Sequence, residues 1–454
     1  MKIIGLDIGT TSICATVIST QSGEVLKTLN ANNGSFIVCE DSFAKIQDAT
    51  IILKTSKDLI ARLIAEFAPI AGIGLTGQMH GIVYINQHGD AVSPLFTWQD
   101  GRGDLTYEDQ KSYAESLSEM TGYPLATGFG AVTHFYNFKN GLVPSEAVSF
   151  CTISDFVAMQ LAGLSSATIH SSHAASVGLF DLQNACFDRA AIEDAGFDFS
   201  QFPTVANDFI QIGLTKEQIP VIIAIGDNQA SFIGSVSDMK NSILVNVGTG
   251  SQLSFLTDHF SLEEGMEIRA FNGTQFLMVC SSLCGGRAYA ILHAFFQSVL
   301  DMAGLEKMNL YPFMDQLSED FADLQDKLEI HTQFSGTRED PAARGKIFNV
   351  SEENFTPQHF IVGVLEGVVN ELFEKFAHAQ GASKKSILVG AGNGIRKGKV
   401  LQKMFAKKFG LEMRIPLHEE EAAFGAALAA AVGIWAYQDI ETAQASFPQW
   451  YVDD

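Results

Sequence analysis

Two kinds of apolar pattern alternate along the chain. Short runs rich in Ile, Leu and Val predict strands at 2–8, 12–18, 71–76, 82–86, 220–225, 242–247, 276–280 and 386–390. Longer stretches with helical spacing predict helices at 43–67, 104–120, 154–161, 287–303, 357–378, 398–409 and 419–437. This alternation is typical of α/β proteins. The first two strands differ, because a connection as short as Gly-Thr-Thr predicts an antiparallel hairpin.

One pattern occurs twice. IIGLDIGTTS (3–12) and SILVNVGTGS (242–251) each contain an apolar strand, a polar residue, an apolar residue and then Gly-Thr-x-Ser. A repeat half a chain apart predicts two related domains with equivalent turns. We place these domains at 1–235 and 236–454, and a length of 454 residues suits two or three domains.

Composition narrows the function classes. The net charge of −23 argues against nucleic acid or an anionic membrane as a partner, because no basic surplus neutralises phosphates. The six cysteines are scattered without a C-x-x-C pair, which predicts free thiols and no zinc site. The N-terminal residues lack signal-peptide order, and the uncharged stretch 422–438 is short for a membrane span. We expect a cytoplasmic protein in which this stretch is a buried, close-packed helix.

The two Gly-Thr turns are candidate phosphate sites. Successive N–H groups in a Gly-containing turn can point the same way and bind an anion, and Thr and Ser hydroxyls add donors. Two such turns would hold a polyphosphate from both sides. Asp7, which precedes the first turn, would help to hold a hydrated Mg²⁺ through oxygen. The alternative is two ordinary hairpin turns.

Two motifs for nucleotide binding are rejected. GIGLTG (72–77) fits G-x-G-x-x-G, but the residues after it continue into another apolar strand where a dinucleotide site needs a helix. No G-x-x-x-x-G-K-[ST] run exists, so the chain has no P-loop of that kind.

GQMHG (77–81) and TWQDGR (97–102) are candidate sugar-binding loops. They bring together amide, imidazole, carboxylate and guanidinium groups, which hydrogen-bond hydroxyls, and an indole, which covers a carbon face. The alternatives are core packing for Trp98 and a surface ion pair between Asp100 and Arg102.

VIIAIGDNQAS (221–231) ends a buried strand with an acid, where ligands of α/β proteins bind. Asp227 could accept the proton of a substrate hydroxyl that attacks phosphorus. The alternative is a helix N-cap for a segment that begins near Gln229.

ILVGAGNGIRKGKVLQKMFA (387–406) predicts a strand, a Gly-rich loop and a helix. Its glycines would let a flat ligand approach the backbone, which indicates an adenosine pocket. The alternative is a plain connection between a strand and a helix.

Together these motifs resemble the FGGY family of carbohydrate kinases, over nearly the whole chain and in the right order. The resemblance implies an α/β fold of two duplicated ribonuclease H-like (actin-like ATPase) domains, with an active-site cleft between them. TWQDGR, ATGFGAVTHFY (126–136) and GDNQAS are most similar to members that phosphorylate sedoheptulose, and GQMHG is shared with members that phosphorylate xylulose.

The resemblance also implies roles for individual residues. Asp7 matches the aspartate near Mg²⁺, and Asp227 matches the catalytic base. Sugar-site positions are matched by Gln78, Met79, His80, Trp98, Asp100, Arg102 and Asn228. Positions that bind ATP are matched by Thr10, Thr11 and Ser12, by Gly248, Thr249 and Gly250, and by Gly390, Ala391, Gly392 and Asn393.

Two positions depart from the family pattern on the nucleotide side. Thr337 in SGTRED (335–340) stands where many members carry Glu, and Arg287 in CGGRAYA (284–290) stands where related kinases often carry Asn. These departures concern the nucleotide contacts and leave the sugar site untouched.

The resulting hypothesis is ATP- and Mg²⁺-dependent phosphorylation of the terminal hydroxyl of a ketose. Two Gly-Thr turns position the phosphates, Asp227 receives the proton, and domain closure excludes water. The expected partner is a small sugar, and the chain could assemble as a homodimer. Alternatives are a kinase for D-xylulose or another ketose or polyol, an actin-fold regulator that binds without transferring phosphate, and an ATP-dependent filament protein.

Overall fold

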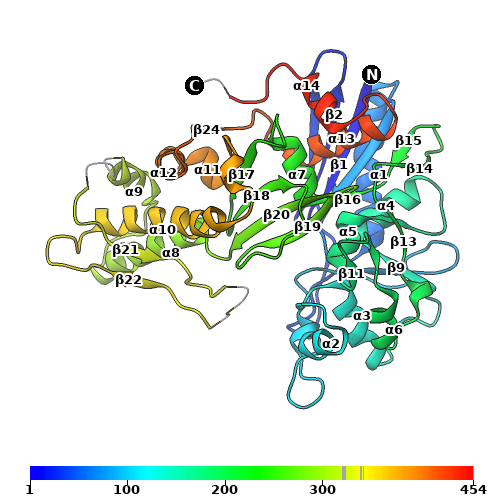
Figure 1. Ribbon diagram of the computed structural model, residues 1–454, viewed down its shortest axis with the longest axis horizontal. Coiled ribbons are helices and arrows are strands. Elements are labelled where there is room, and N and C mark those ends of the chain that lie inside the picture. Colours follow the sequence, from blue (N-terminus) through cyan, green and yellow to red (C-terminus); the bar gives the residue numbers. More distant parts are fainter. Residues whose placement is uncertain (320–323, 338–339, 341, 453–454) are drawn as a thin grey trace. The chain divides into compact units, whose positions relative to one another are not determined.

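The computed structural model describes residues 1–319, 324–337, 340 and 342–452, which form two compact units (Figure 1). The first unit comprises Met1–Ser237, Arg269–Phe276 and His418–Trp450. The second comprises Asp238–Ile268, Leu277–Leu417 and Tyr451–Asp454, of which 453–454 are not described. The units are therefore discontinuous in the sequence, since a C-terminal segment packs with residues from the N-terminal half.

The first unit is built on a seven-stranded mixed sheet. Its strands are β14 (Gln211–Leu214), β15 (Pro220–Ile222), β6 (Gly72–Gly77), β1 (Lys2–Ile8), β2 (Ser12–Ser19) and β3 (Glu24–Asn32) in that order, with β16 (Ile225–Gly226) also beside β6. β1 pairs antiparallel with β2 and parallel with β6. The predicted hairpin is thus confirmed, and GIGLTG lies within a strand, as its rejection as a dinucleotide site requires.

The second unit repeats this topology. Its six-stranded sheet has the order β24 (Met413–Arg414), β23 (Ile387–Ala391), β17 (Ser242–Val247), β18 (Ser251–Thr257), β20 (Gln275–Ser282) and β19 (Glu267–Asn272). β17 pairs antiparallel with β18 and parallel with β23, as β1 does with β2 and β6. The two echoed sequences therefore occupy equivalent hairpins, which supports a duplicated fold.

Helices and short strands complete both units. Those of the first unit are α1 (Ala49–Phe67), α2 (Tyr113–Thr121), α3 (Gly130–Lys139), α4 (Ile153–Leu161), α5 (Ser171–Val177), α6 (Arg189–Asp194), α7 (Asp227–Ser235), α13 (Glu421–Gly433) and α14 (Ile440–Ala445). Those of the second are α8 (Gly286–Met302), α9 (Tyr311–Ser318), α10 (Pro357–His378), α11 (Asn393–Lys397) and α12 (Lys399–Phe409). The remaining strands form short sheets. One contains β4 (Phe36–Ile37), β5 (Ile46–Gln47) and β8 (Leu95–Phe96). The others are two-stranded: β7 (Val83–Ile85) with β9 (Ser149–Cys151), β10 (Thr168–His170) with β13 (Thr204–Ala206), β11 (Phe180–Asp181) with β12 (Cys186–Phe187), and β21 (Glu329–His331) with β22 (Lys346–Phe348).

Two helices begin later than predicted, because capping groups fix their starts. The helix predicted from 43 begins at Ala49, since the side chain of Asp48 accepts the N–H groups of Thr50 and Ile51. The helix predicted from 104 begins at Tyr113, after a capping box formed by Ser112 and Glu115. Apolar spacing alone could not locate these ends.

Helix α13 is the buried helix predicted from its small residues. It packs so closely on the first sheet that a Cβ on Gly5 would lie 1.9 Å from the Ala423 carbonyl oxygen. A Cβ on Gly425 would lie 1.9 Å from the Ala230 carbonyl oxygen of α7. Such contacts exclude larger side chains, and they hold the start of α13 near the end of β1.

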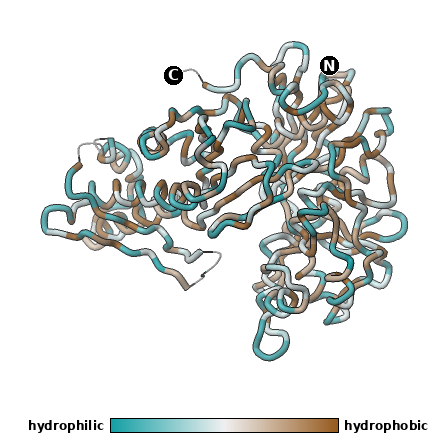
Figure 2. The backbone as a smooth tube through the Cα atoms, in the orientation of Figure 1, coloured by the Kyte–Doolittle hydropathy of each residue, from teal (hydrophilic) through white to brown (hydrophobic). Residues whose placement is uncertain are grey.

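Apolar residues concentrate along both sheets and on the helices that cover them, whereas hydrophilic residues gather in the outer loops (Figure 2). Among the described residues, no helix combines the length and apolar character needed to cross a membrane.

Candidate active site

Asp7 lies near the end of β1, in a row of residues that are in register across the first sheet. Its neighbours in the row are Cys14 on β2 and Thr76 on β6. Asp7 is part-buried, and burial raises its pKa to about 7, with Asp227 and Glu420 contributing further as like charges. A carboxylate in this position would be stabilised by a cation.

The first Gly-Thr turn follows β1 directly, and Asn33 holds it through two hydrogen bonds. The side-chain amide of Asn33 donates to the Gly9 carbonyl at 2.7 Å, and its backbone N–H donates to the Thr11 carbonyl at 2.9 Å. Thr11 and Ser12 are exposed, as a phosphate-binding role requires.

Thr10 is engaged differently from its neighbours. The Trp98 indole N–H donates to its hydroxyl oxygen at 3.0 Å, and this hydroxyl donates to Gln78 Oε1 at 3.4 Å. The structure therefore connects one predicted phosphate residue with two predicted sugar residues.

Gln78, Met79 and His80 follow the end of β6. His80 has a left-handed backbone (φ 71°), stacks on Phe129 with ring centroids 4.6 Å apart, and places Nδ1 2.8 Å from the Ser176 carbonyl oxygen. Met79 packs against the end of β16, where a Cβ on Gly226 would lie 2.8 Å from its Cε. This loop thus lies beside the residue that precedes Asp227. A left-handed non-glycine residue held in place by its surroundings is typical of functional sites.

Asp227 is the first residue of α7, and the N-cap is Gly226. The structure gives α7 no side-chain cap hydrogen bond, so the alternative that Asp227 serves as an N-cap is wrong. Burial raises the pKa of Asp227 to about 6, against the opposing effects of Arg269 and the Asn228 N–H. A part-buried carboxylate without a capping role, ionised near neutrality, is suited to proton transfer.

The strand end before Asp227 is fixed by α5. The Ser172 hydroxyl accepts the Gly226 N–H at 2.9 Å. Next to Asp227, the buried Oδ1 atom of Asn228 has no hydrogen-bond partner in the described part of the chain. A substrate hydroxyl could satisfy this acceptor.

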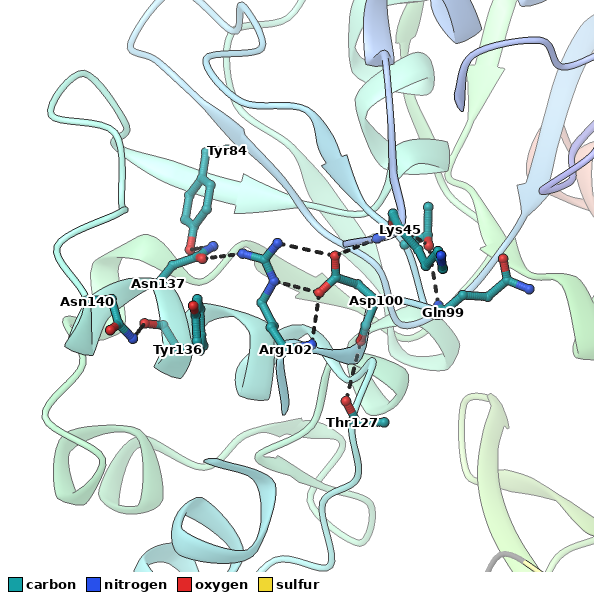
Figure 3. A network of polar contacts seen from close by, with 10 residues as sticks. Lys45, Tyr84, Gln99, Asp100, Arg102, Thr127, Tyr136, Asn137 and Asn140 are labelled. Carbon is teal, nitrogen blue, oxygen red and sulfur yellow. Dashed lines mark hydrogen bonds and ion pairs between the residues drawn. The ribbon is translucent and has the colours of Figure 1, made fainter. Parts of the chain in front are cut away.

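Asp100 and Arg102 form a buried ion pair (Figure 3). Arg102 Nε lies 2.6 Å from Asp100 Oδ1, and Asp100 Oδ2 also accepts the Lys45 N–H at 3.0 Å. The Arg102 guanidinium also donates a hydrogen bond to Asn137 Oδ1, and its Cζ atom lies 4.2 Å from the centroid of the Phe96 ring. Both residues are buried, so the alternative of a surface ion pair is wrong. With these groups engaged by the protein, direct contact of Asp100 and Arg102 with sugar has no support in the geometry.

This ion pair instead supports the loop that presents Trp98. Trp98 is 47% exposed, so the alternative of core packing is wrong. A Cβ on Gly128 (φ +85°) would lie 2.1 Å from the Trp98 carbonyl oxygen, so only glycine fits there. ATGFG thus contributes a backbone that packs against the Trp98 loop.

The second Gly-Thr turn lies in the second unit, between β17 and β18. The first turn of α8 is fastened to it: the Gly286 N–H donates to the Gly248 carbonyl at 2.9 Å, and the Arg287 N–H donates to the Thr249 carbonyl at 3.0 Å. Gly248 and Thr249 are exposed, and Gly250 is part-buried. Arg287 thus lies next to this turn.

The Gly-rich loop after β23 lies beside the same hairpin. Asn246, the counterpart of Asp7, pairs with Ala391 in the register that Asp7 has with Thr76. A Cβ on Gly392 (φ +79°) would lie 2.4 Å from Asn246 Oδ1, and Asn393 is exposed at the start of α11. Gly390 is buried within the strand.

Comparisons with known proteins show the family to which the chain belongs. Residues 2–234 match the N-terminal domain of the FGGY family of carbohydrate kinases, and residues 246–434 match its C-terminal domain. The chain belongs to this family.

Similar proteins include sedoheptulokinases of Mus musculus and Homo sapiens, each 27% identical over 94% of this chain and 96% of the relative. A gluconokinase of Bacillus subtilis is 22% identical over 97% of this chain and 88% of its own. Among solved structures, a xylulose kinase from Rhodospirillum rubrum matches with a TM-score of 0.85 at 18% identity, covering 100% of this chain and 93% of that one. This last likeness concerns the fold alone, which is the two-domain α/β fold of FGGY kinases.

Four further residues adjoin the predicted site of this carbohydrate kinase. They are Asn33 and Gln47, which hydrogen-bond the first turn, and Arg269 and Glu420, whose charges act on Asp227 and Asp7. Arg269 and Glu420 come from segments that return to the first unit late in the sequence. No spacing motif identifies them. The sequence shows that the acidic residue Glu420 precedes an apolar stretch, but it does not show that Glu420 lies close to Asp7.

The donor set near Asp7 fits Mg²⁺ and does not fit a fully protein-bound metal. In the part of the chain that the structure describes, no group of three or more His, Cys, Asp or Glu residues could enclose an ion. Mg²⁺ usually keeps several waters and is held by one or two carboxylates with substrate phosphates. The oxygens of Asp7, together with the negative field of Asp227 and Glu420, are suited to that role.

Of the two departures from the family pattern, Arg287 is the second residue of α8 and Thr337 is described, whereas the neighbouring Arg338 and Glu339 lie outside the described residues.

Proposed function

We propose that this FGGY kinase transfers the γ-phosphoryl group of ATP to the terminal hydroxyl of a ketose, and that the ketose is sedoheptulose, giving sedoheptulose 7-phosphate. The observation that carries the chemistry is Asp227, a part-buried carboxylate at the start of α7 with no helix cap to provide. The choice of sugar rests on the sedoheptulokinases, which are similar over nearly their full length.

Asp227 serves as the base in this proposal. As the terminal oxygen of the sugar forms its bond to the γ-phosphorus, its proton passes to the Asp227 carboxylate and the bond between the γ-phosphorus and the bridging oxygen of ADP breaks. A pKa of about 6 leaves this carboxylate ionised at neutral pH. Its field is moderated by Arg269, which limits the burial-driven rise of the pKa.

The sugar would be held by Gln78, Met79, His80, Trp98 and Asn228. Amide and imidazole groups would hydrogen-bond hydroxyls, and the exposed indole would cover a carbon face. Asp100 and Arg102 act in this proposal as positioning residues, because their ion pair holds the loop of Trp98.

The nucleotide would be held by the two Gly-Thr turns, through residues 10–12 and 248–250, with residues 390–393 beside the adenosine. Asp7 would hold the hydrated Mg²⁺, which offsets phosphate charge during transfer. In phosphoryl transfer the protein contributes chiefly positioning and charge stabilisation, which these backbone-rich turns can supply.

A xylulose kinase is the second candidate, because xylulose kinases of Staphylococcus epidermidis are 22% identical over 98% of this chain. A non-catalytic actin-fold binder is disfavoured, since both Asp7 and Asp227 are present.

A substrate panel tests the proposal. Purified protein is given Mg²⁺-ATP with sedoheptulose, D-xylulose, D-ribulose, L-ribulose, gluconate or glycerol in separate reactions, and kcat/KM is measured from ADP release. The highest value is expected for sedoheptulose. A higher value for another sugar would reassign the substrate, and no sugar-dependent ADP release would remove the kinase proposal for this panel.

A further inference from the structure

Four side chains form a continuous hydrogen-bonded group between the sugar loops and the first phosphate turn. Gln47 Nε2 donates to the Thr10 carbonyl at 2.8 Å, and Gln78 Nε2 donates to Gln47 Oε1 at 2.9 Å. The group is completed by the Thr10 hydroxyl, which lies between Trp98 and Gln78. Thr10 is thereby held through its carbonyl by Gln47 and through its side chain by two sugar-site residues.

Gln47 is the part of this group that the substrate does not touch. It is fully buried at the end of β5, directly before the N-cap of α1, and pairs in register with Leu95 of β8. The backbone that carries Gln47 is therefore fixed in position. Gln78 is 3% exposed. Burial makes these contacts mutually dependent, because a buried amide that loses its partner cannot hydrogen-bond water instead.

We propose that this group, which we call the Gln47 link, makes the geometry of the first phosphate turn depend on sugar bound at Trp98 and Gln78, with Gln47 as a positioning residue. The inference rests on the proposed function. A side-chain amide has two N–H donors, and Gln47 accepts one from Gln78, so a sugar hydroxyl can accept the other. Sugar that orders Trp98 and Gln78 also orders Thr10, and ordering shared by two ligands couples their binding.

Coupling of this kind is reciprocal and measurable without turnover. Titration calorimetry gives the Kd of a non-hydrolysable ATP analogue with Mg²⁺, in the absence and presence of saturating sugar. For the wild type, we expect sugar to tighten nucleotide binding several-fold. For Gln47→Met, we expect this factor to fall close to one and kcat to fall about tenfold or more, while the sugar Kd measured without nucleotide changes less than threefold.

Gln444→Met is the matched control. Gln444 is another buried glutamine of the first unit (1% exposed), and its amide donates to the carbonyls of Ile233 and Val236, away from the link. Gln444→Met should lower the melting temperature about as much as Gln47→Met does, and it should keep the coupling between sugar and nucleotide binding. Thr10→Val removes the shared hydroxyl and should reproduce the Gln47→Met effect, whereas Thr10→Ser should restore most of the coupling.

The outcomes separate the link from the proposed function. A wild type that phosphorylates no sugar contradicts the proposed function. An active wild type without sugar–nucleotide coupling overturns the link, and so does Gln47→Met behaving like Gln444→Met. If Gln47→Met does not fold, the comparison of Thr10→Val with Thr10→Ser decides, and equal coupling in these two variants overturns the link.

Discussion

Replacing Asp227 with Asn separates chemistry from structure at the proposed base. The amide keeps the size and most of the polarity of the carboxylate but cannot accept a proton. Because Asp227 provides no side-chain helix cap, the variant loses no capping bond. The lost attraction between an acid and the positive end of α7 amounts to about 0.3–1 kcal/mol, and relief of the buried charge opposes it.

The expected loss of activity is much larger. With a pKa of about 6, the ionised form of Asp227 outnumbers the protonated form by roughly 30 to 1 at pH 7.5. Nearly all wild-type molecules therefore carry a competent base. General base catalysis contributes about 10²–10⁴-fold, so Asp227→Asn should lower kcat by that factor, equivalent to about 3–5 kcal/mol of barrier.

The assay measures kcat by ADP release with saturating sugar and Mg²⁺-ATP, alongside the melting temperature. Asp188→Ala is the control, since Asp188 is a true N-cap that accepts the Ala191 N–H at 3.1 Å and the Tyr123 hydroxyl at 3.0 Å. It should lose about 1–2 kcal/mol of stability and keep its kcat. The reasoning is refuted if Asp227→Asn retains more than a tenth of wild-type kcat.

Three further outcomes are expected. Asp7→Asn should weaken binding of Mn²⁺, used as a Mg²⁺ probe, in the presence of ADP, measured by electron paramagnetic resonance; unchanged Mn²⁺ affinity would place the metal elsewhere. Burial lowers the pKa of His173 to about 3 and of His134 to about 4, so each histidine binds its proton less readily in the folded than in the unfolded state and destabilises the fold as pH falls below about 6.5; His173→Gln should therefore make the urea midpoint more favourable, relative to the wild type, at pH 4 than at pH 6.5, and an equal difference at both pH values would contradict this. Burial raises the pKa of Asp155 to about 8, so this residue destabilises the folded state increasingly as pH rises towards 8. Asp155→Asn should therefore raise the melting temperature more at pH 8 than at pH 5, and an equal rise at both pH values would count against that pKa.

The strands that carry the site could be predicted because their signals are local. Apolar alternation and a Gly-Thr connection specify the hairpin of β1 and β2. The echo at 242–251 then predicts a second hairpin, whose pairing proved equivalent. Short helices such as α5 were missed, because seven residues rich in Ser and Ala give little periodic signal.

The network around the site could not be predicted from the sequence, because it depends on distant residues meeting. Asp100 and Arg102 have the composition of a sugar site, and only their burial against Asn137 and Phe96 shows that they interact with the protein. Gln47 had no motif. Only the folded chain brings it within hydrogen-bond distance of Gln78, 31 positions away.

The most direct test of the central claim is the identity of the product. Wild-type protein is incubated with sedoheptulose and Mg²⁺-ATP, and the product is analysed by mass spectrometry and by NMR to locate the phosphate. We predict a single sugar monophosphate esterified at the terminal hydroxyl, formed in proportion to ADP and absent without protein. ADP formed without phosphorylated sugar, or phosphate on another hydroxyl, would contradict the account.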